Sequence, residues 1–230
     1  MLLSRPALSP GARASSFAAG RSQSQVLVLD DAFDNAGELE AFGRGDAVFA
    51  QPATAYPGLN APLPADALAP LIETLRPLLE NTFGVPANAP LGCNGYFGLV
   101  TLKPEDLTPS QSIPHVDHVG ARGLAAVAYL CGEDQGGTGF YRHRSTGFER
   151  LTTDNILTYT SVLDAEMRAG PPSGYAVGDH PLFERIGAVA ARYNRLVVYN
   201  CNLLHSGQVD PARLSADPAK GRLTLNLFIG

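Results

Sequence analysis

From residue 93 to its end, the chain is divided into short runs that are rich in β-branched or aromatic residues. Gly, Pro, Asn or Asp bounds each run, which is typical of strands joined by turns. Residues 223–227 alternate strictly between apolar and polar side chains, as a half-buried strand does. This pattern, together with 24 Gly and 18 Pro, argues against a helical bundle and predicts a mainly β fold. The expected strands are residues 96–102, 124–131, 139–143, 196–199 and 223–229.

The clearest helical signal lies before these strands, in residues 66–83. Apolar side chains recur there in steps of three and four, which places them on one stripe that packs against a sheet. Asp66 is expected to cap the helix, Gly84 to end it, and Pro77 to kink or divide it. The elements expected before this helix are a strand at 26–30, a helix at 35–42, a short strand at 47–50 and a Pro- and Gly-rich loop at 52–64.

The length of 230 residues suits one domain, which we place at residues 26–230. Residues 1–25 are rich in Ala, Ser, Arg and Gly and are expected to form a flexible arm. A long excursion, residues 145–194, separates two of the expected strands. We interpret it as an insertion that carries a lid or a substrate-binding surface. Two helices are expected within it, at 154–168 and near 181–191.

Composition restricts the partners of the chain. The formal net charge of −5 and the lack of a dense Lys/Arg block argue against nucleic acid. No run approaches the roughly 18 apolar residues of a membrane span, so no membrane association is expected. Three cysteines without a CxxC spacing, Cys93, Cys131 and Cys201, argue against a disulfide framework and favour a reducing, cytoplasmic compartment. The oligomeric state stays open, and a homodimer is compatible with the sequence.

One short segment places an imidazole beside a carboxylate. His115 and Asp117 are two residues apart, so on an extended segment both side chains point to the same face. His205 follows an expected strand much later in the sequence and is the candidate third ligand of a metal site. Two His and one carboxylate on one face leave coordination positions open, a set that selects Fe(II). A His-x-Asp pair alone is a weak signal, because the same pair also occurs as a hydrogen-bonded pair on a surface.

Arg222 stands at the start of the last expected strand. A guanidinium there can hold a carboxylate through two parallel hydrogen bonds, which Lys cannot match. Thr224 is two residues further along the strand, so its hydroxyl is expected to face the same way. Arg213, in the loop 211–220, is the rival for the carboxylate.

Taken in order, these pieces resemble the Fe(II)/2-oxoglutarate-dependent oxygenase superfamily. The resemblance covers roughly residues 93–230, and within the superfamily the chain resembles a bacterial family of uncharacterised function. The segments that carry it are 115–117, 136–141, 195–199 with 205–207, and 221–224.

The resemblance implies a double-stranded β-helix, a jelly-roll or cupin-like barrel, with N-terminal helices on its outer face. It implies that His115, Asp117 and His205 bind Fe(II) and that Arg222, with Thr224 beside it, binds the distal carboxylate of 2-oxoglutarate. Oxidation of the substrate would then consume O₂ and convert 2-oxoglutarate to succinate and CO₂. The retained Asp117 favours hydroxylation over halogenation.

Several roles stay open. Tyr96 either donates a hydrogen bond to the 2-oxoglutarate carboxylate or packs in the core. His118 is expected beside the site but not as a ligand, whereas His143 and His180 are interpreted as ordinary polar residues. The substrate is expected to be a small molecule or a peptidyl or carrier-bound residue. The alternatives are a cupin-like metal-binding protein without 2-oxoglutarate turnover and a metal enzyme that does not use 2-oxoglutarate.

Overall fold

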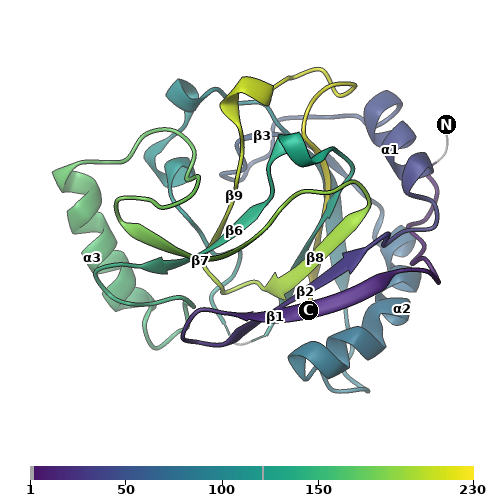
Figure 1. Cartoon of the computed structure of the whole chain (residues 1–230), viewed down its shortest axis with the longest axis horizontal. Helices are drawn as coiled ribbons and strands as arrows, with labels where there is room; N and C mark the ends of the chain where they lie inside the picture. Colours follow the sequence, from purple (N-terminus) through teal and green to yellow (C-terminus); the bar gives the residue numbers. More distant parts are fainter. Residues whose placement is uncertain (1–2, 121) are drawn as a thin grey trace.

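Two antiparallel β-sheets form the body of the molecule in this computed structural model, which describes residues 3–120 and 122–230 (Figure 1). The larger sheet has the strand order β1-β2-β8-β5-β10-β4-β3, and the smaller has the order β7-β6-β9. This jelly-roll-like arrangement confirms the predicted mainly β fold. The strands are β1 Arg13–Ala19, β2 Ser24–Asp30, β3 Gly58–Pro62, β4 Cys93–Val100, β5 Leu124–Tyr129, β6 Thr138–His143, β7 Phe183–Val189, β8 Arg195–Asn200, β9 His205–Gly207 and β10 Leu223–Ile229.

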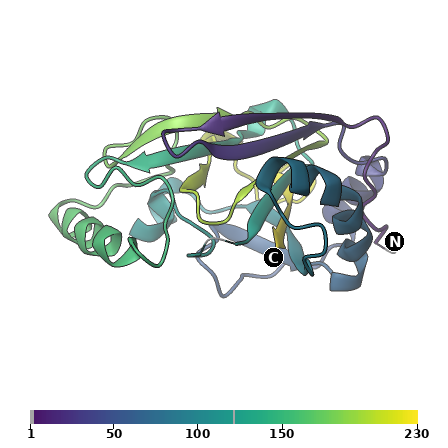
Figure 2. The same cartoon turned by 90° about the horizontal axis from the view of Figure 1, so that it is seen from below.

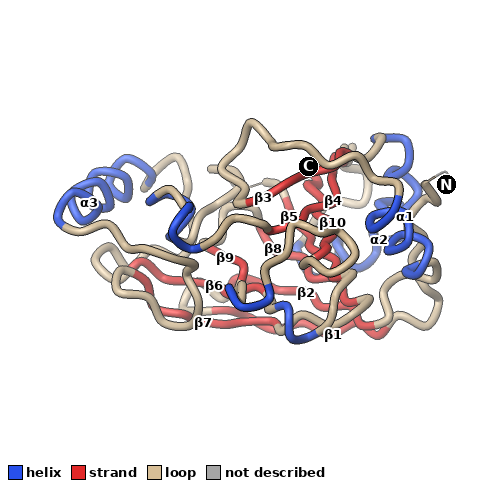
Figure 3. The backbone as a smooth tube through the Cα atoms, turned by 90° about the horizontal axis from the view of Figure 1, so that it is seen from above, coloured by secondary structure: helices blue, strands red, loops and turns tan. Residues whose placement is uncertain are grey.

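In the described part of the chain, three α-helices flank the sheets. α1 (Ala36–Gly45) and α2 (Ala65–Phe83) lie at one end of the molecule, and α3 (Ile156–Ala169) lies at the other end (Figures 1 and 3). Among the described residues, no helix has the length and hydropathy that crossing a membrane requires. Four short 3-10 helices occupy loops, at Pro104–Asp106, Pro109–Ser112, Glu133–Gln135 and Pro211–Arg213.

The alternation of β10 divides its side chains between two environments. Leu223, Leu225 and Leu227 are fully buried in a core that includes Leu39 of α1 and Leu71 of α2. Burial of each such side chain stabilises the fold by about 1.5–3 kcal/mol. Asn226 and Phe228, which alternate with these leucines, line a cavity, which therefore lies on the opposite face of the larger sheet from these helices.

α2 confirms the helix predicted from the apolar stripe. It is one helix that contains Pro70 and Pro77, so Pro77 does not divide it. Packing of the buried stripe compensates for the backbone hydrogen bonds that the two prolines cannot donate. Gly84 ends the helix in the left-handed conformation, with φ of 66°, but Pro64 rather than Asp66 stands at the N-cap position.

Three expectations about loops and the insertion are wrong. Residues 47–50 form no strand, and only an isolated bridge joins Ala50 to Asn60. The predicted loop at 52–64 contains β3, which pairs with β4. The predicted helix near 181–191 is the strand β7, with its ends Phe183 and Val189 buried. β7 pairs with β6, and these long-range hydrogen bonds outweigh its weak local preference.

The N-terminal residues also differ from the prediction, because most of the expected flexible arm is ordered. β1 pairs with β2 along its whole length, from Arg13 opposite Asp30 to Ala19 opposite Ser24. The hairpin extends along one face of the molecule (Figure 2). Phe17 of β1 packs edge-on against Phe140 of the smaller sheet, with ring centroids 6.4 Å apart.

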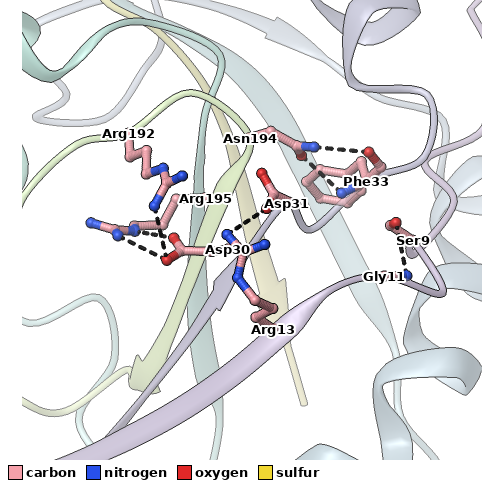
Figure 4. A network of polar contacts seen from close by, with 9 residues as sticks. All are labelled: Ser9, Gly11, Arg13, Asp30, Asp31, Phe33, Arg192, Asn194 and Arg195. Atoms are coloured by element: carbon pink, nitrogen blue, oxygen red, sulfur yellow. Dashed lines mark hydrogen bonds and ion pairs between the residues drawn. The ribbon is translucent and has the colours of Figure 1, made fainter.

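Ion pairs fix this hairpin to β8 (Figure 4). Asp30 accepts a hydrogen bond of 2.6 Å from Nε of Arg195 and lies 3.4 Å from Nη1 of Arg192. Arg13 at the start of β1 and Asp31 just after β2 form a further pair at 2.6 Å, which joins the two ends of the hairpin to each other. The chain is therefore held to the barrel well before residue 26.

Candidate metal centre

Backbone pairing brings the three predicted metal ligands together. His115 and His205 exchange two backbone hydrogen bonds, each of 2.9 Å, and the N–H of Asp117 donates to the carbonyl of Cys201. His115 and Asp117 therefore lie beside β9, although His205 is distant in sequence. One potential ligand atom from each of His115, Asp117 and His205 lies within 4.8 Å of the others.

The ligand atoms are oriented toward a common point. Oδ2 of Asp117 is 3.4 Å from Nε2 of His205, and Oδ1 is 3.9 Å from Nε2 of His115. Nδ1 of His205 lies 2.8 Å from the carbonyl oxygen of Leu203. Because a carbonyl only accepts, Nδ1 carries the proton, and the lone pair of His205 is on Nε2, which faces Asp117.

Burial sets the charges of this group. It lowers the pKa of His205 to about 4, so this imidazole is neutral near neutral pH. It also raises the pKa of Asp117, because the carboxylate loses its hydration and has little to replace it. A carboxylate beside two neutral imidazoles is a donor set that fits Fe(II) or a similar ion.

The three residues open into a cavity of about 490 Å³. This volume is within the range of small-molecule sites, about 300–1,000 Å³. Aromatic and small side chains form much of its wall. The lining includes Tyr56, Tyr96, Val116, Ala125, Val127, Thr138, Tyr175, Tyr199, Ser206, Val209, Asn226 and Phe228.

Arg222 also lines this cavity and is almost fully buried. Its Nε and Nη2 donate to the carbonyls of Gln135 and Gly137, at 3.1 and 3.2 Å, and its guanidinium lies 5.6 Å from the centre of the Tyr129 ring. No carboxylate among the described residues forms an ion pair with it. A buried guanidinium without an acidic partner fits the carboxylate of a ligand.

Arg213, the rival of Arg222, lies elsewhere. Its Nη1 is 3.4 Å from Oδ2 of Asp134, and its side chain is half exposed. It is not among the residues that line the cavity. The structure thus favours Arg222 for binding a carboxylate.

Thr224 and Tyr96 differ in their relation to the cavity. Thr224 is fully buried and does not line the cavity; its hydroxyl donates to the carbonyl of Gly98 at 3.4 Å. Tyr96 lines the cavity and packs against Phe228, with ring centroids 6.0 Å apart. Burial raises its pKa, as do the nearby Tyr56 and Asp117.

The other histidines are not ligands in this geometry. His118 is exposed beside Asp117. His143 is fully buried away from the cavity and hydrogen-bonds to Glu166 and Thr146, at 2.8 and 2.9 Å. His180 is buried, and its Nδ1 accepts from the N–H of Leu182.

Tyr56 is a cavity residue that the sequence did not indicate. It comes from the loop before β3, and its hydroxyl is buried without a hydrogen-bond partner. A buried polar atom without a partner has a free-energy cost, and a bound polar group would remove it. Together with Arg222, which has no acidic partner among the described residues, this hydroxyl fits a carboxylate-bearing ligand.

Comparison with known proteins agrees with this fold. A model of a family of unknown function, DUF6445, matches residues 10–229. No curated protein matches the chain.

Among solved structures, the non-haem α-ketoglutarate-dependent epimerase SnoN from nogalamycin biosynthesis is 14% identical, with a TM-score of 0.50. The match covers 90% of this chain and 79% of that chain. HygX from Streptomyces hygroscopicus matches in its apo form, at 17% identity and a TM-score of 0.46, over 93% of this chain and 87% of that chain. Its iron-bound form matches at 16% identity and a TM-score of 0.42, over 91% and 83%. At these identities the likeness to SnoN shows the shared fold alone.

Proposed function

We propose that this chain, which belongs to the DUF6445 family of unknown function, is an Fe(II)- and 2-oxoglutarate-dependent oxygenase. One observation carries the proposal: a single cavity has a His-Asp-His group and, on another part of its wall, a buried guanidinium without an acidic partner. A metal-binding barrel without a dicarboxylate cosubstrate has no need of the second feature. α-Ketoglutarate, which SnoN uses according to its description, is the same compound as 2-oxoglutarate.

Each residue has a defined part in this proposal. His115, Asp117 and His205 would hold Fe(II) on one face and leave its other positions to the ligands in the cavity. Arg222 would bind the distal carboxylate of 2-oxoglutarate and so direct its 2-oxo acid end toward the metal. When bound there, iron would supply the oxidative chemistry with O₂ and 2-oxoglutarate. Phe228 and Tyr96 add aromatic surface to the wall of this space.

We further propose that the reaction is a hydroxylation, since Asp117 is retained as a carboxylate ligand. The cavity takes a small molecule, or the side chain of a peptidyl or carrier-bound substrate, but is too small for a folded partner or duplex nucleic acid.

Anaerobic titration tests the cosubstrate directly. Fe(II) and then 2-oxoglutarate are added to the purified apoprotein, and the weak visible charge-transfer band of a chelated 2-oxo acid is recorded. We expect the band in the wild type, its loss in His115→Ala, and a much higher 2-oxoglutarate requirement in Arg222→Ala. His118→Ala is the control, because this exposed histidine is adjacent to the group without belonging to it. Bound Fe(II) with no band would reject 2-oxoglutarate and favour a cupin-like metal-binding protein.

A further inference from the structure

Tyr56 brings a phenol hydroxyl to the cavity from outside the barrel strands. Neighbouring contacts hold its loop: the carbonyl of Tyr56 accepts from the N–H of Gly58 at 2.9 Å, and Nε2 of Gln111 donates to the carbonyl of Ala55 at 3.1 Å. The Tyr56 ring packs edge-on against Tyr96, with centroids 5.7 Å apart. The side chain is therefore anchored at its backbone and ring. Its hydroxyl makes no hydrogen bond of ordinary geometry, although the Thr224 hydroxyl lies beside it.

Gly98 makes room for this hydroxyl. It lies on β4 opposite Thr224 of β10 and Asn60 of β3. A Cβ at this position would be 2.5 Å from Oη of Tyr56 and 2.6 Å from Nδ2 of Asn226. The phenol thus occupies space that any other residue at position 98 would fill, on the cavity face of the larger sheet.

The positive charge of Arg222 affects the pKa of this hydroxyl. Burial raises the pKa of Tyr56 to about 12, and both the nearby Arg222 and the Thr224 hydroxyl oppose this rise. The phenol therefore keeps its proton near neutral pH and is a hydrogen-bond donor close to an unpaired guanidinium.

The neighbouring hydroxyls already have partners. Tyr175 donates to the carbonyl of Leu102 at 2.6 Å, and the hydroxyls of Tyr129 and Thr138 bond to each other at 2.7 Å. Among the cavity tyrosines near Arg222 in residues 3–120 and 122–230, Tyr56 is thus the one whose hydroxyl lacks an acceptor. A carboxylate bound to Arg222 has further lone pairs that can accept a hydrogen bond from the Tyr56 hydroxyl.

We propose that Tyr56 and Arg222 together bind the distal carboxylate of the cosubstrate, so that Tyr56 determines which 2-oxo acids the site accepts. This inference rests on the proposed function. Because Tyr56 would contact only the second carboxylate, it should add affinity for 2-oxoglutarate and none for pyruvate, which has the 2-oxo acid end alone.

The test compares Tyr56→Phe with Tyr175→Phe, a matched change in the same cavity at a hydroxyl that is already bonded. Both variants and the wild type are loaded anaerobically with Fe(II) and titrated with 2-oxoglutarate and with pyruvate. Thermal unfolding of the metal-free proteins is measured alongside. For Tyr56→Phe we expect about a tenfold loss of 2-oxoglutarate affinity, equivalent to about 1.4 kcal/mol, with pyruvate affinity unchanged. The melting temperature should not fall, because no hydrogen bond is lost.

Tyr175→Phe should behave in the opposite way: it loses the bond to Leu102 and melts earlier, but it keeps the wild-type ratio of 2-oxoglutarate to pyruvate affinity. Three results for Tyr56→Phe would each overturn the inference. The first is an equal loss of affinity for 2-oxoglutarate and for pyruvate, and the second is an unchanged affinity for 2-oxoglutarate. The third is a lower melting temperature with no change in the ratio of the two affinities. If the wild type itself does not bind 2-oxoglutarate, the proposed function fails as well; if it binds and Tyr56→Phe binds equally, only this inference fails.

Discussion

His115 and His205 form a bridge between two distant segments, in which each backbone N–H donates to the other's carbonyl at 2.9 Å and the imidazole rings lie 4.5 Å apart. Their positions are thus fixed by backbone hydrogen bonds that do not require a metal. The candidate metal centre is preorganised, so its three residues can be changed without removing the bonds that position them.

Asp117→Asn separates metal binding from folding. In the metal-free protein the carboxylate, whose side chain is 17% exposed, lacks a compensating cation, and partial desolvation raises its pKa. The amide removes this charge, so we expect an unchanged or higher melting temperature without metal and loss of the stabilisation that Fe(II) or Co(II) gives the wild type. Anaerobic thermal unfolding with and without metal measures both effects. His118→Ala should retain the metal-induced shift; retention of that shift in Asp117→Asn would exclude this residue as a ligand.

Arg222→Lys tests the role of the guanidinium. Lys cannot reach the carbonyls of Gln135 and Gly137 while presenting two parallel donors to a carboxylate. We expect the free energy of unfolding to fall by about 1–2 kcal/mol and 2-oxoglutarate affinity to fall by about tenfold or more. Arg213→Lys is the matched control, since Arg213 is half exposed and paired with Asp134. Denaturant unfolding measures the change in stability, and anaerobic titration measures the change in 2-oxoglutarate affinity. A larger loss of affinity in Arg213→Lys than in Arg222→Lys would indicate that Arg213 binds the carboxylate.

The sequence predicted those parts of the fold that depend on local pattern. β10 and α2 bury one face each, so their apolar residues recur with the period of the element. The pair His115 and Asp117 was found for the same reason, because two residues on one extended segment share a face.

Other parts depend on partners that lie far away in the sequence. β1 exposes most of its side chains, and β7 includes Gly187, so neither has the pattern of a half-buried strand; pairing with β2 and β6 makes them strands. Tyr56 had no local signal either. Its position beside Gly98 follows from the packing of a loop on the sheet.

Glu149 should make the stability of the N-terminal hairpin depend on pH. Burial raises the pKa of this carboxyl, but hydrogen bonds from Ser22, Arg21 and Arg142 outweigh burial and hold the pKa at about 2, below the usual 4.5. Since the unfolded chain takes up the proton first, the stabilisation is complete above about pH 5 and is lost as the pH falls toward 2.

Glu149→Gln should therefore lower the free energy of unfolding by about 2–3 kcal/mol near neutral pH, and the difference from wild type should shrink below about pH 4.5. Urea unfolding over this pH range measures it. Glu184→Gln is the control: this carboxylate pairs with the same Arg142 but is 45% exposed, so its loss should have a small effect. A difference for Glu149→Gln that stays constant with pH would contradict the assigned pKa.

Gly98→Ala should disturb the cavity through Tyr56. The added Cβ would lie 2.5 Å from the Tyr56 hydroxyl, so the phenol must move, and we expect a loss of about 1–3 kcal/mol in stability together with weaker 2-oxoglutarate binding. Gly37→Ala in α1 is the control, because its Cβ meets nothing within 4 Å and should stabilise the helix by about 0.5–1 kcal/mol. In a Tyr56→Phe background the oxygen that collides is absent, so Gly98→Ala should cost less there than in the wild type, a coupling that a double-mutant cycle by denaturant unfolding measures. Additive costs would show that the clash with Asn226, and not with Tyr56, limits the size of residue 98.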